Sequence, residues 1–96
     1  MNLTNSYEIY YSDSFYEHIK RHRLSGQKSI LIKIDTLLSE LREHPFTGTG
    51  HPEQLSADKR GLWARRITQK HRLIYQVNDT IITVNVLSAF GHYNDK

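Results

Sequence analysis

Residues 63–77 read WARRITQKHRLIYQV, and this stretch decides the fold. Two runs rich in aromatic and β-branched residues, Trp63–Thr68 and His71–Val77, predict two strands. Only Gln69–Lys70 separates them, a span short enough for a two-residue hairpin turn. We therefore expect an antiparallel pair of strands, the first two of a three-stranded meander.

The two predicted strands have faces of different character, because successive side chains of a strand point to opposite sides of the sheet. The odd positions are largely apolar: Trp63, Arg65, Ile67, Leu73, Tyr75 and Val77. The even positions are largely polar: Ala64, Arg66, Thr68, Arg72, Ile74 and Gln76. The odd face should pack on helices, and the even face should present Arg66 and Arg72 from neighbouring strands.

Two helices are predicted before the hairpin. Ser12 and Asp13 offer an N-cap for a helix from Asp13 to about Leu24, and Ser25–Gly26 ends it. A longer helix over Gln27–Arg42 has one apolar stripe, and His44–Pro45 ends it because the residue before proline avoids the α region. The stripe consists of Ile30, Leu31, Ile34, Leu37, Leu38 and Leu41.

Two further strands complete the expected fold. Ser6–Tyr11 is rich in strand formers, and Thr80–Phe90 follows a turn at Asn78–Asp79, with Ile82, Val84 and Val86 as its core face. Residues 46–52 form a loop with two glycines. The order is βααβββ, an α+β fold in which two N-terminal helices pack on a mostly antiparallel twisted sheet. Its 96 residues make one small domain, residues 1–96.

Composition excludes several classes of protein. The chain contains no cysteine, so disulfides, zinc–thiolate sites and thiol nucleophiles are absent. The opening residues MNLTNSYE lack the basic and apolar segments of a secretion signal, and no apolar run reaches membrane-spanning length. We expect a soluble cytoplasmic protein that needs no membrane.

The net charge of +3 is concentrated in one segment. Between Ser56 and Arg72 the chain carries one anion, Asp58, and six cations: Lys59, Arg60, Arg65, Arg66, Lys70 and Arg72. A dense positive segment around a single tryptophan favours a polyanion partner, most simply a nucleic acid.

Arg66 and Arg72 are the first candidates for binding phosphate, because a planar guanidinium can bind phosphate in a bidentate manner. The simpler alternative is that each arginine pairs with a surface carboxylate, but anions are scarce in this segment. Glu53 is an isolated loop glutamate, which usually means a solvated side chain. Near arginines, however, it would stay ionised and could act as a general base.

The histidines are less informative. His92, beside Tyr93, follows the last strand and on composition alone is best interpreted as an exposed residue of a terminal tail. His18 and His22 have the i, i+4 spacing of two metal ligands, yet no third ligand is evident. A solvated helix face is the favoured interpretation of that pair, so no metal or cofactor is expected.

A base, cations and an acid together suit one reaction. RNA carries its own nucleophile, the 2′-hydroxyl, which a base must deprotonate. Cations neutralise the charge that grows on the phosphate, and an acid protonates the leaving 5′-oxygen. DNA lacks the 2′-hydroxyl and cannot be cut in this way.

Three motifs resemble the YoeB/Txe toxins of the RelE-like superfamily of bacterial toxin–antitoxin systems, over residues 6–93. They are Pro45-Phe-x-Gly-x-Gly-x-Pro-Glu-x-Leu55, Gly61-x-Trp-x-Arg-Arg-Ile-Thr-x-x-His-Arg-Leu-x-Tyr75 and His92-Tyr93. The resemblance implies a microbial-RNase-like fold and a ribosome-dependent endoribonuclease that cuts mRNA in the A site. It implies as partners a cognate antitoxin, the 70S ribosome with its mRNA, and in some relatives a second copy in a homodimer, with DNA bound only through the antitoxin complex.

The resemblance also implies the roles of site residues. The family's general base falls on Glu53, its phosphate-binding arginines on Arg66 and Arg72, and its general acid on His92. Tyr93 would orient the nucleotide.

The chain departs from its relatives at two places. Some carry a lysine after the motif leucine, where this chain has Ser56, so Lys59 or Arg60 would have to contact the substrate instead. Ala89-Phe90-Gly91 is apolar where relatives often have a basic residue. These departures leave open a non-catalytic RNA- or ribosome-binding module on the same scaffold. A DNA-binding repressor is weaker, because the second helix is too apolar and too acidic at its end to read a major groove.

Overall fold

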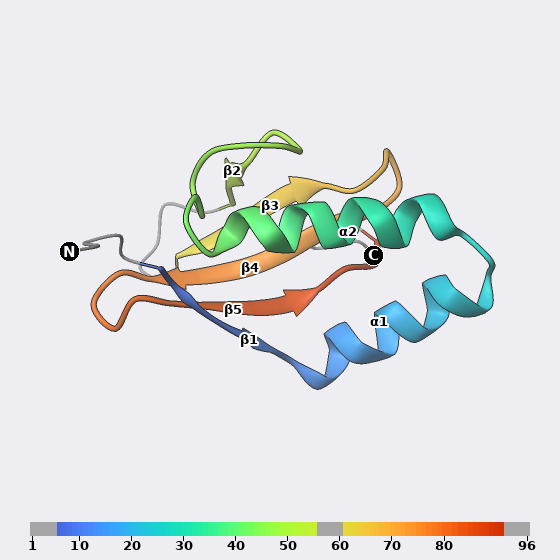
Figure 1. The fold of residues 1–96 in the computed structure, drawn as a ribbon, viewed down its shortest axis with the longest axis horizontal. Coiled ribbons are helices and arrows are strands. Elements are labelled where there is room, and N and C mark those ends of the chain that lie inside the picture. Colours follow the sequence, from blue (N-terminus) through green and yellow to red (C-terminus); the bar gives the residue numbers. More distant parts are fainter. Residues whose placement is uncertain (1–5, 56–60, 92–96) are drawn as a thin grey trace.

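The computed structural model describes residues 6–55 and 61–91 of the chain (Figure 1). Two helices pack on one five-stranded sheet, which confirms the predicted α+β fold. The elements are β1 (Glu8–Tyr11), α1 (Asp13–Leu24), α2 (Lys28–Leu41), β2 (Glu53–Gln54), β3 (Leu62–Arg66), β4 (Arg72–Asn78) and β5 (Thr83–Ser88).

The strand order across the sheet is β1-β5-β4-β3-β2. The pairs β2–β3, β3–β4 and β4–β5 are antiparallel, and β1 pairs with β5 in parallel. The expected mostly antiparallel meander is therefore correct. Strand β2 is an addition, because the sequence predicted only a loop before the cationic segment.

Helix α1 has the predicted bounds, Asp13–Leu24, and its start is explained by Ser12. The Ser12 hydroxyl accepts the backbone N–H of Phe15 at 3.0 Å and donates to the carbonyl of Leu87 at 2.6 Å. One side chain thus caps the helix and ties its first turn to the end of β5.

Helix α2 runs across the sheet (Figure 1), and its apolar stripe supplies the centre of the core. Ile30, Ile34, Leu37 and Leu41 are buried, whereas Leu31 and Leu38 at the margins of the stripe are half-buried. The helix begins one residue later and ends one residue earlier than predicted, because Gln27 and Arg42 are its caps.

The connection between β3 and β4 is longer than a two-residue hairpin. Arg66 pairs with Arg72, so residues 67–71 form the loop. The N–H groups of Ile67 and Thr68 both donate to the carbonyl of His71, and the Thr68 hydroxyl accepts the N–H groups of Lys70 and His71. The predicted two-residue turn was wrong, because these loop bonds replace the strand pairing that had been expected for residues 67, 68 and 71.

The predicted separation of the two strand faces is confirmed for the odd positions. Ile67, Leu73 and Tyr75 belong to the core cluster, and Trp63 and Val77 pack against it. The even face is more apolar than expected at its centre, since Ala64 and Ile74 are buried there. Arg66 is exposed at the end of that face, as predicted.

Strand β5 begins at Thr83 rather than Thr80. The Asn78 side-chain oxygen accepts the N–H groups of Thr80 and Ile81, which extends the turn. Val84 and Val86 are fully buried, as predicted for the core face. Ile82 was wrongly included in that face, because it lies in the turn before β5 with a positive φ of 52° and is only half-buried. Opposite the step from Ile74 to Tyr75 the register shifts, because Tyr75 pairs with Val86 but Ile74 pairs with Ser88. After such a bulge, each later side chain of β5 points to the side of the sheet opposite to the one that simple alternation predicts.

Neither of the helices in the described ranges has the length and apolar character required to cross a membrane.

Candidate functional site

Glu53 lies on the short strand β2, at the outer edge of the sheet. It pairs directly with Ala64 of β3, and its side chain is exposed. Just before it, the carbonyl of Gly50 accepts the N–H of Arg66 at 2.7 Å. This bond joins the loop over residues 46–52 to β3. Glu53, which the sequence had assigned to an irregular loop, therefore lies on a strand at the edge of the sheet.

Arg66 and Arg72 face each other across β3 and β4 as directly paired residues. Two guanidinium groups on one face repel each other unless an anion lies between them or other groups compensate their charge. Partial compensation is present at Arg72, whose Nη1 donates to the carbonyls of Thr68 at 2.6 Å, Gln69 at 3.2 Å and His71 at 3.2 Å. The guanidinium of Arg72 is therefore fixed on the β3–β4 loop.

The sheet register brings three of the predicted residues together. Glu53 pairs with Ala64, and Ala64 pairs with Ile74, so these residues share the outer face of the sheet. Arg66 and Arg72 lie on that same face, one pair further along. One carboxylate and two guanidinium groups from three adjacent strands thus form a mixed-charge surface that suits an anionic phosphodiester beside a hydroxyl group that can give up its proton.

The chain after β5 reaches the same end of the sheet. The backbone N–H of Arg72 donates to the carbonyl of Gly91 at 2.9 Å, and Gly91 immediately precedes His92 in the sequence. The remaining predicted site residues, His92, Tyr93, Lys59 and Arg60, lie outside the described residues, as does Ser56.

A pocket of roughly 730 Å³ opens between the end of α1, the β3–β4 loop and the residues that follow β5. Within the described ranges, its lining includes Arg21, His22, Lys70, His71, Phe90 and Gly91. Two of these side chains are cationic, so the pocket extends the positive character of the site beyond the paired arginines.

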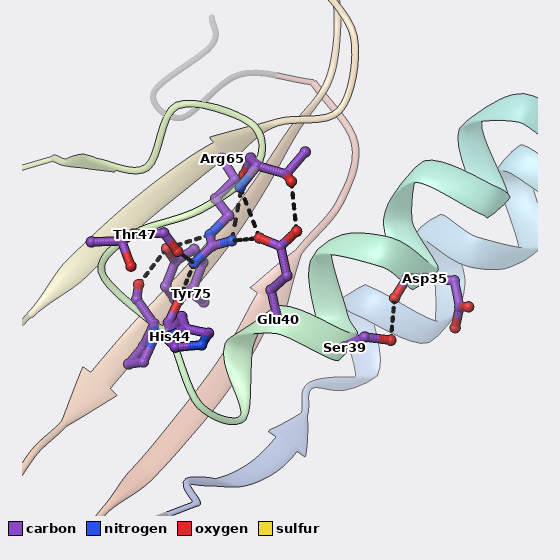
Figure 2. A network of polar contacts seen from close by, with 9 residues as sticks. Asp35, Ser39, Glu40, His44, Thr47, Arg65 and Tyr75 are labelled. Carbon is purple, nitrogen blue, oxygen red and sulfur yellow. Dashed lines mark hydrogen bonds and ion pairs between the residues drawn. The ribbon is translucent and has the colours of Figure 1, made fainter.

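Arg65 does not belong to the binding surface, although it contributes to the positive charge of the segment. Its side chain is 0% exposed and forms an ion pair with Glu40 of α2 at 2.8 Å (Figure 2). Its Nη2 donates to the carbonyls of His44 and Thr47, and its Nε donates to the hydroxyl of Tyr75 at 3.0 Å. The strand parity, which places Arg65 on the core face, was the signal for this structural role.

The Arg65 network holds the loop that leads to Glu53. The hydroxyl of Tyr75 donates to the carbonyl of Pro45, and Glu40 accepts both the N–H and the hydroxyl of Thr49. Hydrogen bonds from Thr49, together with Arg65, hold the pKa of Glu40 below its ordinary value of 4.5, although burial opposes them. Burial raises the pKa of Tyr75, which Arg65 partly offsets. Loop, helix and sheet are therefore joined through one buried guanidinium.

His18 and His22 are not a solvated face, so that interpretation was wrong. His22 is 1% exposed, and its Nε2 lies 2.8 Å from the carbonyl oxygen of Ala89. The Nδ1 of His18 accepts the N–H of Ala89 at 3.0 Å. Within residues 6–55 and 61–91, no group of three or more potential ligands could hold a metal ion. Both histidines instead bind the segment that follows β5.

Comparison with known proteins gives one family. Residues 11–93 match the family described as the YoeB-like toxin of bacterial type II toxin–antitoxin systems. The toxin YoeB of Escherichia coli K12 is 44% identical over 57 residues, which cover 59% of this chain and 68% of that protein. The toxin YoeB of Mycobacterium bovis is 37% identical over 70 residues, which cover 73% of this chain and 80% of that protein.

Solved structures agree. A YoeB/ParE toxin from Agrobacterium tumefaciens superimposes with a TM-score of 0.79 at 29% identity, covering 90% of this chain and 99% of that one. A YoeB dimer from Staphylococcus aureus gives a TM-score of 0.75 at 31% identity, covering 92% and 99%. The toxin in a heterotetrameric YoeB–YefM toxin–antitoxin complex from the same organism gives 0.72 at 32% identity, covering 91% and 98%.

Proposed function

This chain belongs to the YoeB-like toxins of bacterial type II toxin–antitoxin systems, and from that membership we propose that it is a metal-independent endoribonuclease that cuts mRNA in the ribosomal A site. Cleavage of the message during translation would stop protein synthesis, which accounts for toxicity in the cytoplasm. The proposal gives a chemical role to each residue of the mixed-charge surface.

In the proposed reaction Glu53 removes the proton of a 2′-hydroxyl, and that oxygen attacks the adjacent phosphorus. The bond from phosphorus to the 5′-oxygen breaks, which leaves a 2′,3′-cyclic phosphate and a free 5′-hydroxyl. Arg66 and Arg72 neutralise the charge that develops on the phosphate oxygens. His92 donates the proton that the departing 5′-oxygen needs, and Tyr93 orients the nucleotide.

One observation carries the proposal: Glu53, Arg66 and Arg72 lie on three adjacent strands and share one face of the sheet. The Arg72 N–H also binds the carbonyl of the residue before His92. The residues to which we assign the roles of base and phosphate ligands, and the residue that precedes the proposed acid, therefore lie on neighbouring strands and on the segment bonded to them. A general base or acid typically contributes a rate factor of about 10²–10⁴.

The test is primer extension on translated mRNA, with wild-type protein and with Glu53→Gln, Arg72→Met and His92→Gln variants. We expect discrete cuts within codons for the wild type and a loss of about 10²-fold or more for each variant. Glu43→Gln, which changes an exposed glutamate in the turn after α2, is the control and should cut normally. Full cleavage by all three site variants would contradict the assignment.

A non-catalytic RNA- or ribosome-binding module is the second candidate, and Ser56 favours it because some relatives have a lysine at that position. In such a module the arginines would bind phosphates without cleavage. If the chain is instead a nuclease, Lys59 or Arg60 would supply to the substrate the cation that Ser56 lacks. The same primer extension decides, since a binding module would stall ribosomes without producing new 5′ ends.

We further propose a cognate antitoxin as the main protein partner, by analogy with the YoeB–YefM complex of Staphylococcus aureus. The YoeB dimer of that organism makes a homodimer of this chain a second possibility to measure. In this proposal mRNA is the substrate and the ribosome presents it to the toxin. DNA would be bound only through the antitoxin complex. Co-purification with the product of an adjacent short acidic reading frame tests the first of these partners.

A further inference from the structure

Three consecutive residues after β5 are each contacted by histidines. The Ala89 peptide is bound on both sides, because its N–H donates to Nδ1 of His18 and its carbonyl oxygen lies 2.8 Å from Nε2 of His22. The N–H of Gly91 donates to Nδ1 of His71 at 3.0 Å. Ala89, Phe90 and Gly91 are the last described residues before His92.

Phe90 lies between these contacts, inside a cluster of rings. Its ring centroid is 4.5 Å from that of His71, 5.1 Å from that of His22 and 5.8 Å from that of His18. The guanidinium carbon of Arg21 lies 3.9 Å from the centre of the same ring. Tilted ring contacts and a cation–π contact therefore hold the side chain of Phe90, the residue between the two bound peptide groups.

The hydrogen bonds determine where the ring protons lie. An Nδ1 that accepts an N–H carries no proton, so His18 and His71 must be neutral for these bonds to form. An Nε2 that faces a carbonyl oxygen must carry a proton, which makes His22 a donor. His22 is 1% exposed, so the residues packed around its ring fix the position of the ring.

We propose that His18, His22 and His71 are positioning residues that fix residues 89–91, the segment that directly precedes the proposed general acid His92 in the sequence. We call this group of three the histidine clamp. The inference rests on the proposed nuclease function and explains a departure from the relatives. An apolar Ala89-Phe90-Gly91 can stand where relatives often have a basic residue, because the ring cluster holds it in place.

The clamp should open in acid. Protonation of His18 or His71 at Nδ1 removes the acceptor of one N–H. Within the described residues, the charged and titratable groups that act on His18 are Glu17, Arg21 and His22 of its own helix. Lys70 and His71 lie across the pocket, on the β3–β4 loop. Burial, and then the positive charge of Arg21, hold the pKa of His18 below its ordinary value of 6.5, so the His18 bond persists at neutral pH.

The experiment compares two substitutions at His18 and at His71. Asparagine places an acceptor oxygen near the position of Nδ1 and does not titrate, whereas leucine fills the space and accepts nothing. We expect His18→Leu and His71→Leu to lower kcat on programmed ribosomes by about tenfold to a hundredfold with little change in KM, the scale of a misplaced catalytic group. The asparagine variants should retain most of kcat and lose less of it on acidification.

Hydrogen exchange supplies a readout that needs no substrate. The amides of Ala89 and Gly91 should exchange faster in the corresponding leucine variants and stay protected in the asparagine variants. Glu43→Gln, at the exposed glutamate already used as the cleavage control, should alter neither measurement.

Unchanged exchange and unchanged kcat in both leucine variants would overturn the clamp. Equal losses in the leucine and asparagine variants would also overturn it, because the acceptor would then be irrelevant. If exchange responds as expected but the wild type does not cut RNA, the nuclease function fails while the contact between histidines and peptide groups stands.

Discussion

Arg65 and Arg66 are adjacent in the chain, yet the sheet sends them to opposite environments. Arg65 is buried against α2 with Glu40 and backbone carbonyls, whereas Arg66 is exposed beside Arg72. A count of charges treats the two residues alike. The alternation of a strand distinguishes them, and it was visible in the sequence once the strand had been located.

Substitution of these two arginines should separate stability from function. Arg65→Met leaves buried carbonyls without a donor, so we expect a loss of about 3 kcal/mol in the free energy of unfolding. Arg66→Met should change that free energy by less than about 0.5 kcal/mol, because its side chain is exposed, while it weakens cleavage. Urea denaturation and primer extension measure the two effects, and equal destabilisation by both variants would disprove the division of roles.

Glu40 gives the network a defined pH dependence. Its pKa is depressed below 4.5 in the folded state, so it stabilises the fold above that pH, and the contribution is lost as pH falls through the folded-state pKa. We expect Glu40→Gln to be less stable than the wild type at pH 7 and the difference to shrink in acid. Urea denaturation between pH 7 and pH 3 checks this, and a constant difference across that range would refute it.

Among the elements, the two helices were the most predictable. The apolar stripe of α2 and the Ser12 cap of α1 are local patterns that need no knowledge of the rest of the chain. Strand β2 was missed because Glu53–Gln54 is too short to show alternation. The parallel pairing of β1 with β5 was also beyond local signals, since it joins segments more than 70 residues apart.

The candidate site also contains residues that the sequence predicted and residues that only the structure revealed. Arg66 and Arg72 followed from parity. Glu53 was a possible base because arginines lie near it in the sequence, and the family motifs then assigned it that role. The histidine clamp could not be recognised, because the i, i+4 spacing of His18 and His22 is equally typical of a metal pair and of a solvated face. Only the path of the chain after β5 shows that both rings bind Ala89.

The loop before β2 depends on a close approach at Gly50, where φ is +87° and an added Cβ would lie 2.9 Å from the carbonyl oxygen of Arg66. Gly50→Ala should therefore displace the loop and Glu53, with a kcat loss on the order of tenfold or more. Gly26→Ala is the matched control, because φ there is +72° but nothing lies within 4 Å of the added Cβ.

Both glycine variants carry the strain of a positive φ, which costs about 1–2 kcal/mol. The difference between them isolates the close approach to β3. Urea denaturation should place Gly50→Ala below Gly26→Ala in stability, and only Gly50→Ala should cut RNA slowly. Similar cleavage by both variants would mean that the loop does not position Glu53.

At the scale of the whole molecule, the sheet separates two chemistries. The helices and the apolar core occupy one face, and the paired arginines with Glu53 occupy the other. Glu53, Arg66 and Arg72 therefore present their charges on the face away from the helices, which composition alone cannot reveal. Arg65 contributes to the count but its charge is neutralised by Glu40, so the cations that can meet a phosphate are fewer than the sequence indicates.

This arrangement predicts how RNA binding depends on salt. Each phosphate contact to a single strand adds about 0.7 to the slope of log K against log salt concentration. Arg66→Met should therefore reduce the slope by about 0.7 for a 2′-O-methyl RNA oligonucleotide, which cannot be cut because its nucleophile is blocked. Lys33→Met, on α2 in the helical layer, should leave the slope unchanged. Equal slopes for the wild type and both variants would place the RNA elsewhere on the surface, because a phosphate contact cannot be removed without releasing fewer counterions.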